Sequence, residues 1–96
     1  MASPKAPAGH FSILYFASAS TFTNKTSEYL SAPVEARGLF SKLEELYPGI
    51  NDKVLNSCAV TVNLSYIEID GDEAPDLKIV IKEGDEVAII PPVSSG

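Results

Sequence analysis

The sequence predicts an α+β fold in which one mixed sheet carries one main helix on a single face. Short apolar runs of strand length stand before and after one amphipathic segment, and such elements bury their apolar sides by packing as layers. The chain has 96 residues, which suits one small domain and is too short for two. The last apolar run, residues 87–90, ends at Pro91-Pro92, because neither proline can donate a hydrogen bond to a strand ladder.

Residues 11–31 predict an antiparallel hairpin. Residues 11–17 are apolar in part on both faces, which is typical of a strand in the middle of a sheet. Residues 18–25 are polar and rich in threonine and asparagine, so they predict a hairpin loop. Residues 26–31 predict a weaker strand, which pairs antiparallel with the first because the connection is too short for a crossover.

The main helix is expected to open at Ala32-Pro33, since a proline costs little in the first helical turn. Gly38 lowers the helix propensity by roughly 1 kcal/mol relative to alanine, which indicates either close packing or a later start of the helix. Pro48-Gly49 ends the helix. Its apolar stripe has helical spacing and consists of Leu39, Phe40, Leu43, Leu46 and Tyr47.

The second half of the chain predicts a connector and four strands. The connector covers residues 51–57, and the strands cover residues 58–63, 66–69, 77–82 and 87–90. The first of these strands is apolar on one side and is expected in the interior of the sheet. In residues 77–82, Leu77, Ile79 and Ile81 share one face and lysines stand at both ends of the other, which is typical of an edge strand. Gly84-Asp85 supplies the turn before the terminal strand.

Composition narrows the class of partner. Seven basic and thirteen acidic residues give a formal charge of −6, which argues against nucleic acid and suits a partner with a basic groove. The single cysteine, Cys58, excludes an internal disulfide, so we expect a reducing, cytoplasmic compartment. No apolar run approaches the length of a membrane span. We expect a disordered leader at residues 1–9, a domain at residues 10–90 and a flexible tail at residues 91–96.

The strand order and the protruding tail are typical of the ubiquitin-like β-grasp fold. The run Gly-Asp-Glu-Val-Ala-Ile-Ile-Pro-Pro-Val-Ser at residues 84–94 resembles the C-terminal signature of the small subunits of molybdopterin synthase, the sulfur carriers of molybdenum cofactor biosynthesis. Residues 13–17 resemble the first strand of that family, Val62-Asn63 its middle strand, and residues 46–50 the helix exit of its eukaryotic members. The family ends in Gly-Gly, whereas here Ser95 precedes Gly96.

The resemblance implies a carried group rather than a stand-alone catalyst. An activating enzyme that uses ATP would adenylate the Gly96 carboxylate and convert it to a thiocarboxylate. The sulfur would then pass to a pterin precursor in the large subunit, within a heterotetramer. The resemblance implies no metal and no stably bound cofactor.

Strand alternation places Ala88 and Ile90 on the face opposite Val87 and Ile89. We expect the first pair to form an exposed apolar spot that contacts the large subunit, although a second buried sheet face is the alternative. The contact would continue into the tail, where we expect Pro91, Pro92, Val93, Ser94 and Ser95 to enter the partner from a sheet edge.

Other functions remain open at this stage. A ubiquitin-like modifier, or a sulfur carrier for thiamine or transfer-RNA thiolation, would share the fold and the tail. A β-grasp interaction domain with an inert tail is a third possibility. Cys58 is expected in the core, His10 has no second metal ligand near it in the sequence, and a solvated loop rather than a calcium site is expected at Asp70, Asp72, Glu73 and Asp76.

Overall fold

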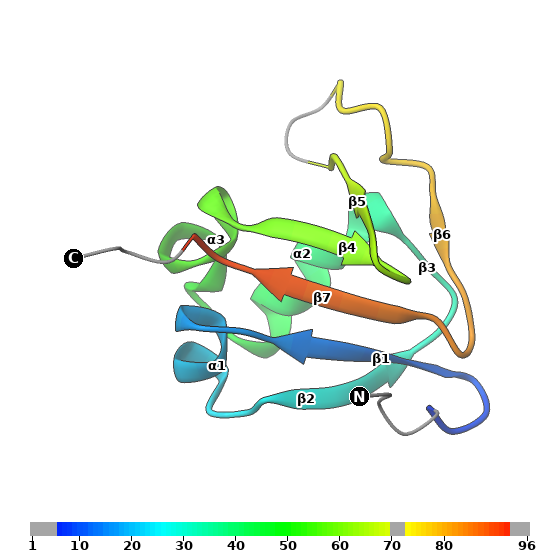
Figure 1. The fold of residues 1–96 in the computed structure, drawn as a ribbon, viewed down its shortest axis with the longest axis horizontal. Helices are drawn as coiled ribbons and strands as arrows, with labels where there is room; N and C mark the ends of the chain where they lie inside the picture. The colour runs from blue at the N-terminus through cyan, green and yellow to red at the C-terminus, as the bar shows by residue number, and fades with distance from the viewer. Residues whose placement is uncertain (1–5, 70–72, 93–96) are drawn as a thin grey trace.

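The computed structural model describes residues 6–69 and 73–92, which form a five-stranded mixed sheet with helices on one face (Figure 1). The strand order is β2-β1-β7-β4-β5. The strands are β1 (His10–Tyr15), β2 (Ser27–Ser31), β4 (Ala59–Val62), β5 (Ser65–Ile67) and β7 (Glu86–Ile90). Strand β7 runs parallel to β1 and antiparallel to β4, so the terminal strand is the central strand of the sheet. The expected α+β fold, the β1–β2 hairpin and the interior position of β4 are confirmed.

Residues 77–82 differ from the predicted strand. Only β6 (Val80–Ile81) is extended, and it pairs with β3 (Val34–Glu35) in a separate two-stranded sheet. The carbonyls of Leu77 and Ile79 instead accept hydrogen bonds from the amides of Arg37 and Ala36. These amides belong to the first turn of the main helix, where no acceptor exists within the helix. Residues 77–79 therefore cap the N-terminus of the main helix instead of forming a strand. The alternation predicted for a strand is lost there, and Ile79 is exposed while Ile81 is buried.

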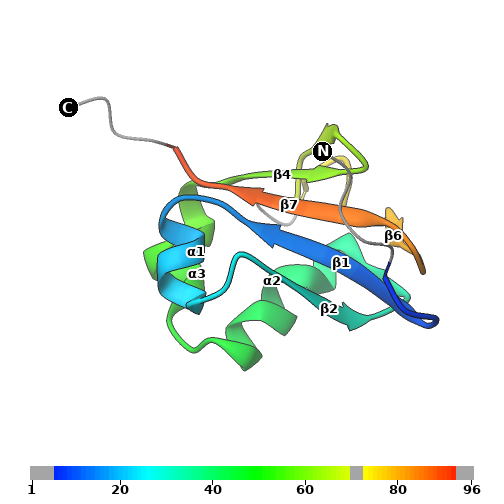
Figure 2. The ribbon, with the colours of Figure 1, turned by 60° about the horizontal axis from the view of Figure 1, so that its bottom comes forward.

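The main helix, α2 (Ala36–Leu46), crosses one face of the sheet (Figure 2). It begins after Ala32-Pro33, because the next two residues form β3. A Cβ at Gly38 would meet the nearest side chain at 3.7 Å, an ordinary contact, so close packing does not require this glycine. The helix begins two residues before Gly38, so its later start does not explain the glycine either. Leu39 and Leu43 are fully buried. Leu46 is 43% exposed, so the apolar stripe is buried only over its first part.

Helix α1 (Ser18–Thr23) occupies the predicted hairpin loop, which makes that prediction wrong. Serine and threonine are weak helix formers, but tertiary burial overrides propensity. Ala19 is fully buried, and the Thr23 hydroxyl donates to the Ala19 carbonyl at 2.9 Å. Asn24 then ends the helix in the left-handed conformation (φ 60°).

The predicted connector after α2 is also helical in part. It contains α3 (Ile50–Lys53) and a 3-10 turn at Leu55–Ser57. The Glu44 carboxylate accepts the amides of Gly49 and Asn51 at 2.7 and 3.0 Å, which satisfies donors at the start of α3. The hydrogen bonds from these two amides hold the pKa of Glu44 below its usual range.

The core lies between α2 and the sheet. Its fully buried side chains include Phe11, Ile13, Leu39, Leu43, Ile50, Ile81, Val87 and Ile89. Part of the predicted leader joins the domain, because the Gly9 carbonyl accepts the Ala32 amide and the Gly9 amide donates to Glu83 at 2.8 Å. None of the helices that the structure describes is both long enough and apolar enough to span a membrane.

Candidate functional site

The sheet face turned away from α2 carries the accessible apolar surface, and we call it the outer face. Cross-strand pairs place Tyr66, Thr61, Ala88 and Leu14 in one row across β5, β4, β7 and β1. Tyr29 shares this face through its pairing with Ser12, and Ile90 through its pairing with Ala59. The helices in Figure 2 all lie on the other side of the sheet.

Exposed aromatic side chains lie at the margins of the outer face. Tyr66 is 73% exposed and Phe16 is 47% exposed. Ala88 is only 8% exposed although no described helix covers it, because its single methyl group lies between Thr61 and Leu14 in adjacent strands. The expectation that Ala88 is exposed is therefore wrong. Ile90 is half-buried and keeps part of its surface accessible.

The base of the tail lies at the end of the central strand. The Phe16 amide donates to the Ile89 carbonyl at 3.1 Å, so β7 stays paired almost to Pro91. Pro91 is buried and Pro92 is exposed. The chain therefore leaves the domain between β1 and β4 rather than at a sheet edge, and Pro91 belongs to the domain. The other predicted contact residues, Val93, Ser94 and Ser95, and the predicted carrier Gly96 lie outside the described residues.

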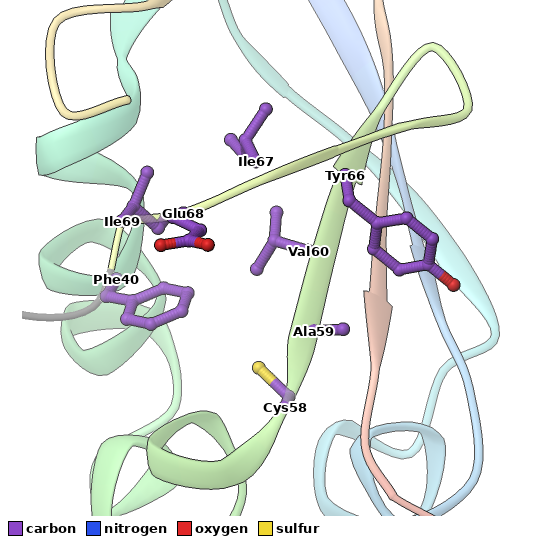
Figure 3. A pocket seen from close by; sticks show the side chains of 8 residues that line it. All are labelled: Phe40, Cys58, Ala59, Val60, Tyr66, Ile67, Glu68 and Ile69. Atoms are coloured by element: carbon purple, nitrogen blue, oxygen red, sulfur yellow. The ribbon is translucent and has the colours of Figure 1, made fainter. Parts of the chain in front are cut away.

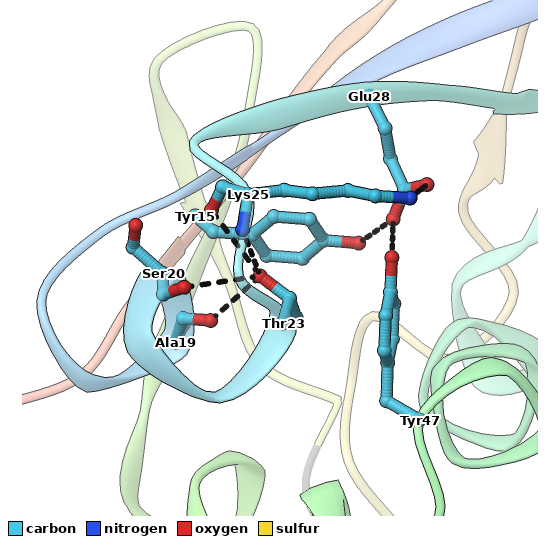
Figure 4. Close-up of polar contacts among 7 residues, drawn as sticks. All are labelled: Tyr15, Ala19, Ser20, Thr23, Lys25, Glu28 and Tyr47. Carbon is cyan, nitrogen blue, oxygen red and sulfur yellow. Dashed lines mark hydrogen bonds and ion pairs between the residues drawn. The ribbon is translucent and has the colours of Figure 1, made fainter.

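A cluster of polar side chains on the core side of the sheet links β1, β2 and the end of α2 (Figure 4). The hydroxyls of Tyr15 and Tyr47 donate to Oε2 of Glu28 at 2.6 and 2.5 Å, and the Lys25 ammonium lies 3.1 Å from Oε1. Partial burial alone raises the pKa of Glu28, but the hydrogen bonds from the tyrosines and Lys25 outweigh it, so the pKa lies below its usual range. Burial, and then the bond to Glu28, raise the pKa of Tyr15 well above its ordinary value.

This cluster contains a carboxylate, Glu28, and an ammonium group, Lys25, but these groups already form hydrogen bonds with each other and with the two tyrosines. The Tyr15 and Tyr47 rings meet edge to face with centroids 6.2 Å apart, and the Lys25 ammonium lies 5.7 Å from the Tyr47 ring centre. A carboxylate held ionised by three donors stabilises a fold and is a weak proton acceptor. The cluster therefore joins β1, β2 and the end of α2.

Comparison with known proteins identifies the family. A family model described as the ThiS family matches residues 13–96. The molybdopterin synthase sulfur carrier subunits of Phaeosphaeria nodorum and Pyrenophora tritici-repentis are 71% and 73% identical to this chain over 96 residues, with all of this chain and all of each relative covered. The chain belongs to the molybdopterin synthase sulfur carrier family.

Solved structures confirm the ubiquitin-like β-grasp fold of this sulfur carrier. A putative molybdopterin converting factor subunit 1 from Pyrococcus furiosus has a TM-score of 0.70 at 19% identity, with 90% of this chain and 100% of that chain covered. The small archaeal modifier protein 1 of Methanosarcina acetivorans has a TM-score of 0.69 at 20% identity, covering 98% and 100%. A complex of subunits 1 and 2 of the Helicobacter pylori molybdopterin-converting factor matches with a TM-score of 0.63 at 22% identity, covering 91% and 99%.

A hollow of the carrier lies between α2 and the β4–β5 edge (Figure 3). Phe40 of α2 faces Cys58 and Ile67 across it, and its rim carries Glu68. Cys58 is half-buried against the core, and its thiol donates to the Leu55 carbonyl at 3.3 Å. Cys58 was expected as a buried core residue, and it packs against the core but is only partly buried.

The described part of the carrier contains no group of three His, Cys, Asp or Glu side chains placed to hold a metal ion. The ring of His10 bonds to the Ala8 carbonyl at 3.0 Å. Asp76 accepts the Glu68 amide at 2.7 Å, whereas Asp70 and Asp72 of the same acidic loop lie outside the described residues.

Sequence reasoning missed the side chain of Tyr66, which is the most exposed aromatic residue of the outer face. The alternation over residues 11–17 already predicted apolar side chains on both faces of the first strand, with Phe16 opposite the core-facing Tyr15. Tyr66 precedes the core-facing Ile67, so the same alternation in β5 would have placed Tyr66 on the outer face.

Proposed function

We propose that this chain carries sulfur on Gly96 as a thiocarboxylate and delivers it within molybdopterin synthase. Membership of the sulfur carrier family, with fungal relatives more than two thirds identical along their whole length, supports this role in molybdenum cofactor biosynthesis. An α-carboxyl group has a pKa of about 3.3–3.7, so it is ionised at neutral pH and can attack the α-phosphate of ATP. Pyrophosphate leaves, and a sulfur donor then displaces AMP from the acyl adenylate.

The activating enzyme would supply the ATP site and the catalytic groups for this step. The acidic and tyrosine side chains of the Glu28 cluster are mutually satisfied and lie on the core side of the sheet. The domain therefore acts by presenting its tail. A terminal glycine adds no side chain beside the reacting carbon, which suits a narrow channel. The five residues after the buried Pro91 span at most about 17 Å.

We propose that the large subunit docks on the outer face. The observation that carries this proposal is the exposure of two aromatic residues, Phe16 and Tyr66. The Phe16 amide bonds to Ile89 beside the tail base, and Tyr66 lies on the outer face in the row of Ala88. Exposed aromatic side chains are the residues that most often dominate protein interfaces. The H. pylori structure is a complex of subunits 1 and 2, which supports a partner of this type. The net charge of −6 suits a partner whose docking surface is basic.

We further propose that the carrier acts in the cytoplasm. Cys58 is the single cysteine of the chain, so no internal disulfide holds this fold together. A small domain stabilised by its core alone fits a reducing compartment. The ATP needed by the activating enzyme is available there.

Transfer of labelled sulfur tests the proposed function. The chain is first incubated with ATP, a labelled sulfur donor and the activating enzyme, and is then repurified and mixed with the large subunit and a pterin precursor. We expect label on the chain after the first step and on the pterin after the second. Label that stays on the chain when the large subunit is present would contradict the proposal. Attachment of the chain to lysine side chains would indicate a ubiquitin-like modifier instead.

A further inference from the structure

The turn between β4 and β5 holds a leucine where the backbone favours glycine. Asn63 and Leu64 have φ angles of 51° and 73°, both in the left-handed region. Two-residue hairpin turns with positive φ at both positions strongly prefer Asn-Gly, because a Cβ is disfavoured in this conformation. Asparagine tolerates it, whereas a bulky side chain such as leucine rarely adopts it. The Leu64 backbone is therefore strained.

Packing within the domain does not explain this leucine. The Leu64 side chain is 86% exposed, the highest value among the large apolar residues that the structure describes as exposed. The position thus combines an unfavourable backbone conformation with an apolar side chain in water. Strained residues of this kind persist where the surroundings fix them, and they cluster at functional sites.

The surroundings do fix this turn. The Asn63 side chain donates to Asp85 at 3.1 Å and accepts the Glu86 amide at 2.9 Å. The Asn63 amide also donates to the Glu86 carbonyl at 2.7 Å. These three hydrogen bonds attach the hairpin tip to the start of β7. They fix the backbone of the turn, and with it the position of Leu64, in the free protein.

We propose that Leu64 is an anchor that enters an apolar pocket of the protein docked on the outer face. This inference rests on the proposed function and names a further contact for the same partner. Tyr66 lies two residues from Leu64 in the same hairpin, and it belongs to the outer face. Both side chains are largely exposed, so a partner docked on the outer face can reach the tip as well. Side chains that enter a well-packed pocket of the partner and lose contact with water contribute most of the binding energy at many interfaces.

The charges beside the tip indicate the kind of pocket. The segment that holds Asn63 contains Glu83, Asp85 and Glu86 against one lysine, Lys82. An apolar pocket rimmed by basic side chains complements this arrangement, whereas nucleic acid or an anionic membrane surface does not. The occupant is therefore a protein with a basic rim around the pocket.

The position of Leu64 relative to the tail indicates what a contact there would do. The tip lies beside the start of β7, whereas the tail leaves from the other end of that strand (Figure 1). Five residues of strand separate the two ends by about 13–17 Å. A partner that contacts the protein at both ends of β7 fixes the orientation of this strand. It thereby also fixes the direction in which the tail enters the partner.

Two substitutions at this position separate strain from binding. Leu64→Gly gives the favoured Asn-Gly turn, so we expect the thermal unfolding midpoint to stay equal or rise. We expect the same variant to bind the large subunit about 10- to 100-fold more weakly, because the anchor is lost. Leu64→Asn keeps a residue that tolerates the left-handed conformation and should lose affinity equally. Leu46→Asn removes another exposed leucine, on the helix side, and should bind like the unmodified chain.

The outcomes distinguish this inference from the proposed function. Unchanged affinity in both Leu64 variants, with weakened binding in Tyr66→Ala, would overturn the anchor and leave the docking face intact. A lower unfolding midpoint in both Leu64 variants would show that the leucine serves the fold, which also overturns the anchor. No binding of the unmodified chain to the large subunit would overturn the docking proposal and the anchor together.

Discussion

Replacement of Tyr66 with alanine is expected to weaken binding of the large subunit about 30-fold while the domain stays folded. A fully covered aromatic side chain buries roughly 150–250 Å². Tyr66 is 73% exposed in the free domain, which leaves about 150 Å² for a partner to cover. At about 25 cal/mol per Å² this area is worth at most about 3.8 kcal/mol. A loss of about 2 kcal/mol, typical of an interface hot spot, corresponds to the 30-fold change.

The cost to folding should be much smaller. Tyr66 pairs across the strands with Thr61, and such a pair contributes about 0.2–1 kcal/mol. Titration calorimetry with the purified large subunit gives the affinity, and urea unfolding of the free chain gives the stability. An unchanged dissociation constant in a variant that unfolds like the original would refute the outer face as the docking surface.

Three further changes test other parts of the account. Ser95→Gly restores the Gly-Gly end of the family and should leave folding and binding intact, while sulfur transfer stays equal or improves, because the hydroxyl and Cβ are removed from the channel. Ala19→Leu should lower the free energy of unfolding by about 1–3 kcal/mol, because helix α1 packs this residue without exposed surface. Glu28→Gln should destabilise the chain at neutral pH and matter progressively less in acid. The pKa of Glu28 is lowered in the folded chain, so its stabilising effect is present above the ordinary pKa of a glutamate and is lost as pH falls through the folded value.

Each of these changes has an outcome that contradicts it. A clear loss of sulfur transfer in Ser95→Gly would show that the serine is used. Unchanged urea unfolding of Ala19→Leu would mean that α1 is not packed as a helix against the core. A constant difference in unfolding free energy between Glu28→Gln and the original chain from pH 7 to acid would exclude an ionised carboxylate as the source of the stability.

The strands of the five-stranded sheet could be predicted because they depend on local pattern, whereas β3 and the short extent of β6 could not. The terminal strand is a continuous apolar run closed by Pro91-Pro92, and it was found nearly to the residue. Helix α1 could not be found in the same way, because serine and threonine favour turns and the helix depends on burying Ala19. The start of α2 was placed too early, since only the pairing of β3 with β6 shows that the chain is still extended at Val34.

The outer face was predicted in part for a related reason. Alternation placed Ala88 and Ile90 on the correct face, but exposure depends on the neighbours in adjacent strands. The small side chain of Ala88 is covered by those neighbours, and the larger Tyr66 is not. The strained backbone of Leu64 could not be predicted either. A two-residue turn with two positive φ angles prefers Asn-Gly, so the sequence Asn-Leu gives no signal for such a turn.

The intact mass of the chain after activation tests the central claim most directly. The chain and a variant lacking Gly96 are each incubated with ATP, a sulfur donor and the activating enzyme, and are then measured by mass spectrometry. We expect the original chain to gain the mass difference between sulfur and oxygen, and the shortened chain to gain nothing. Its tail is shorter by about 3.5 Å and ends in a residue with a Cβ, and reacting groups tolerate displacements of only about 1 Å. Equal conversion of the shortened chain, or no gain in the original chain, would contradict a sulfur carrier that acts through Gly96.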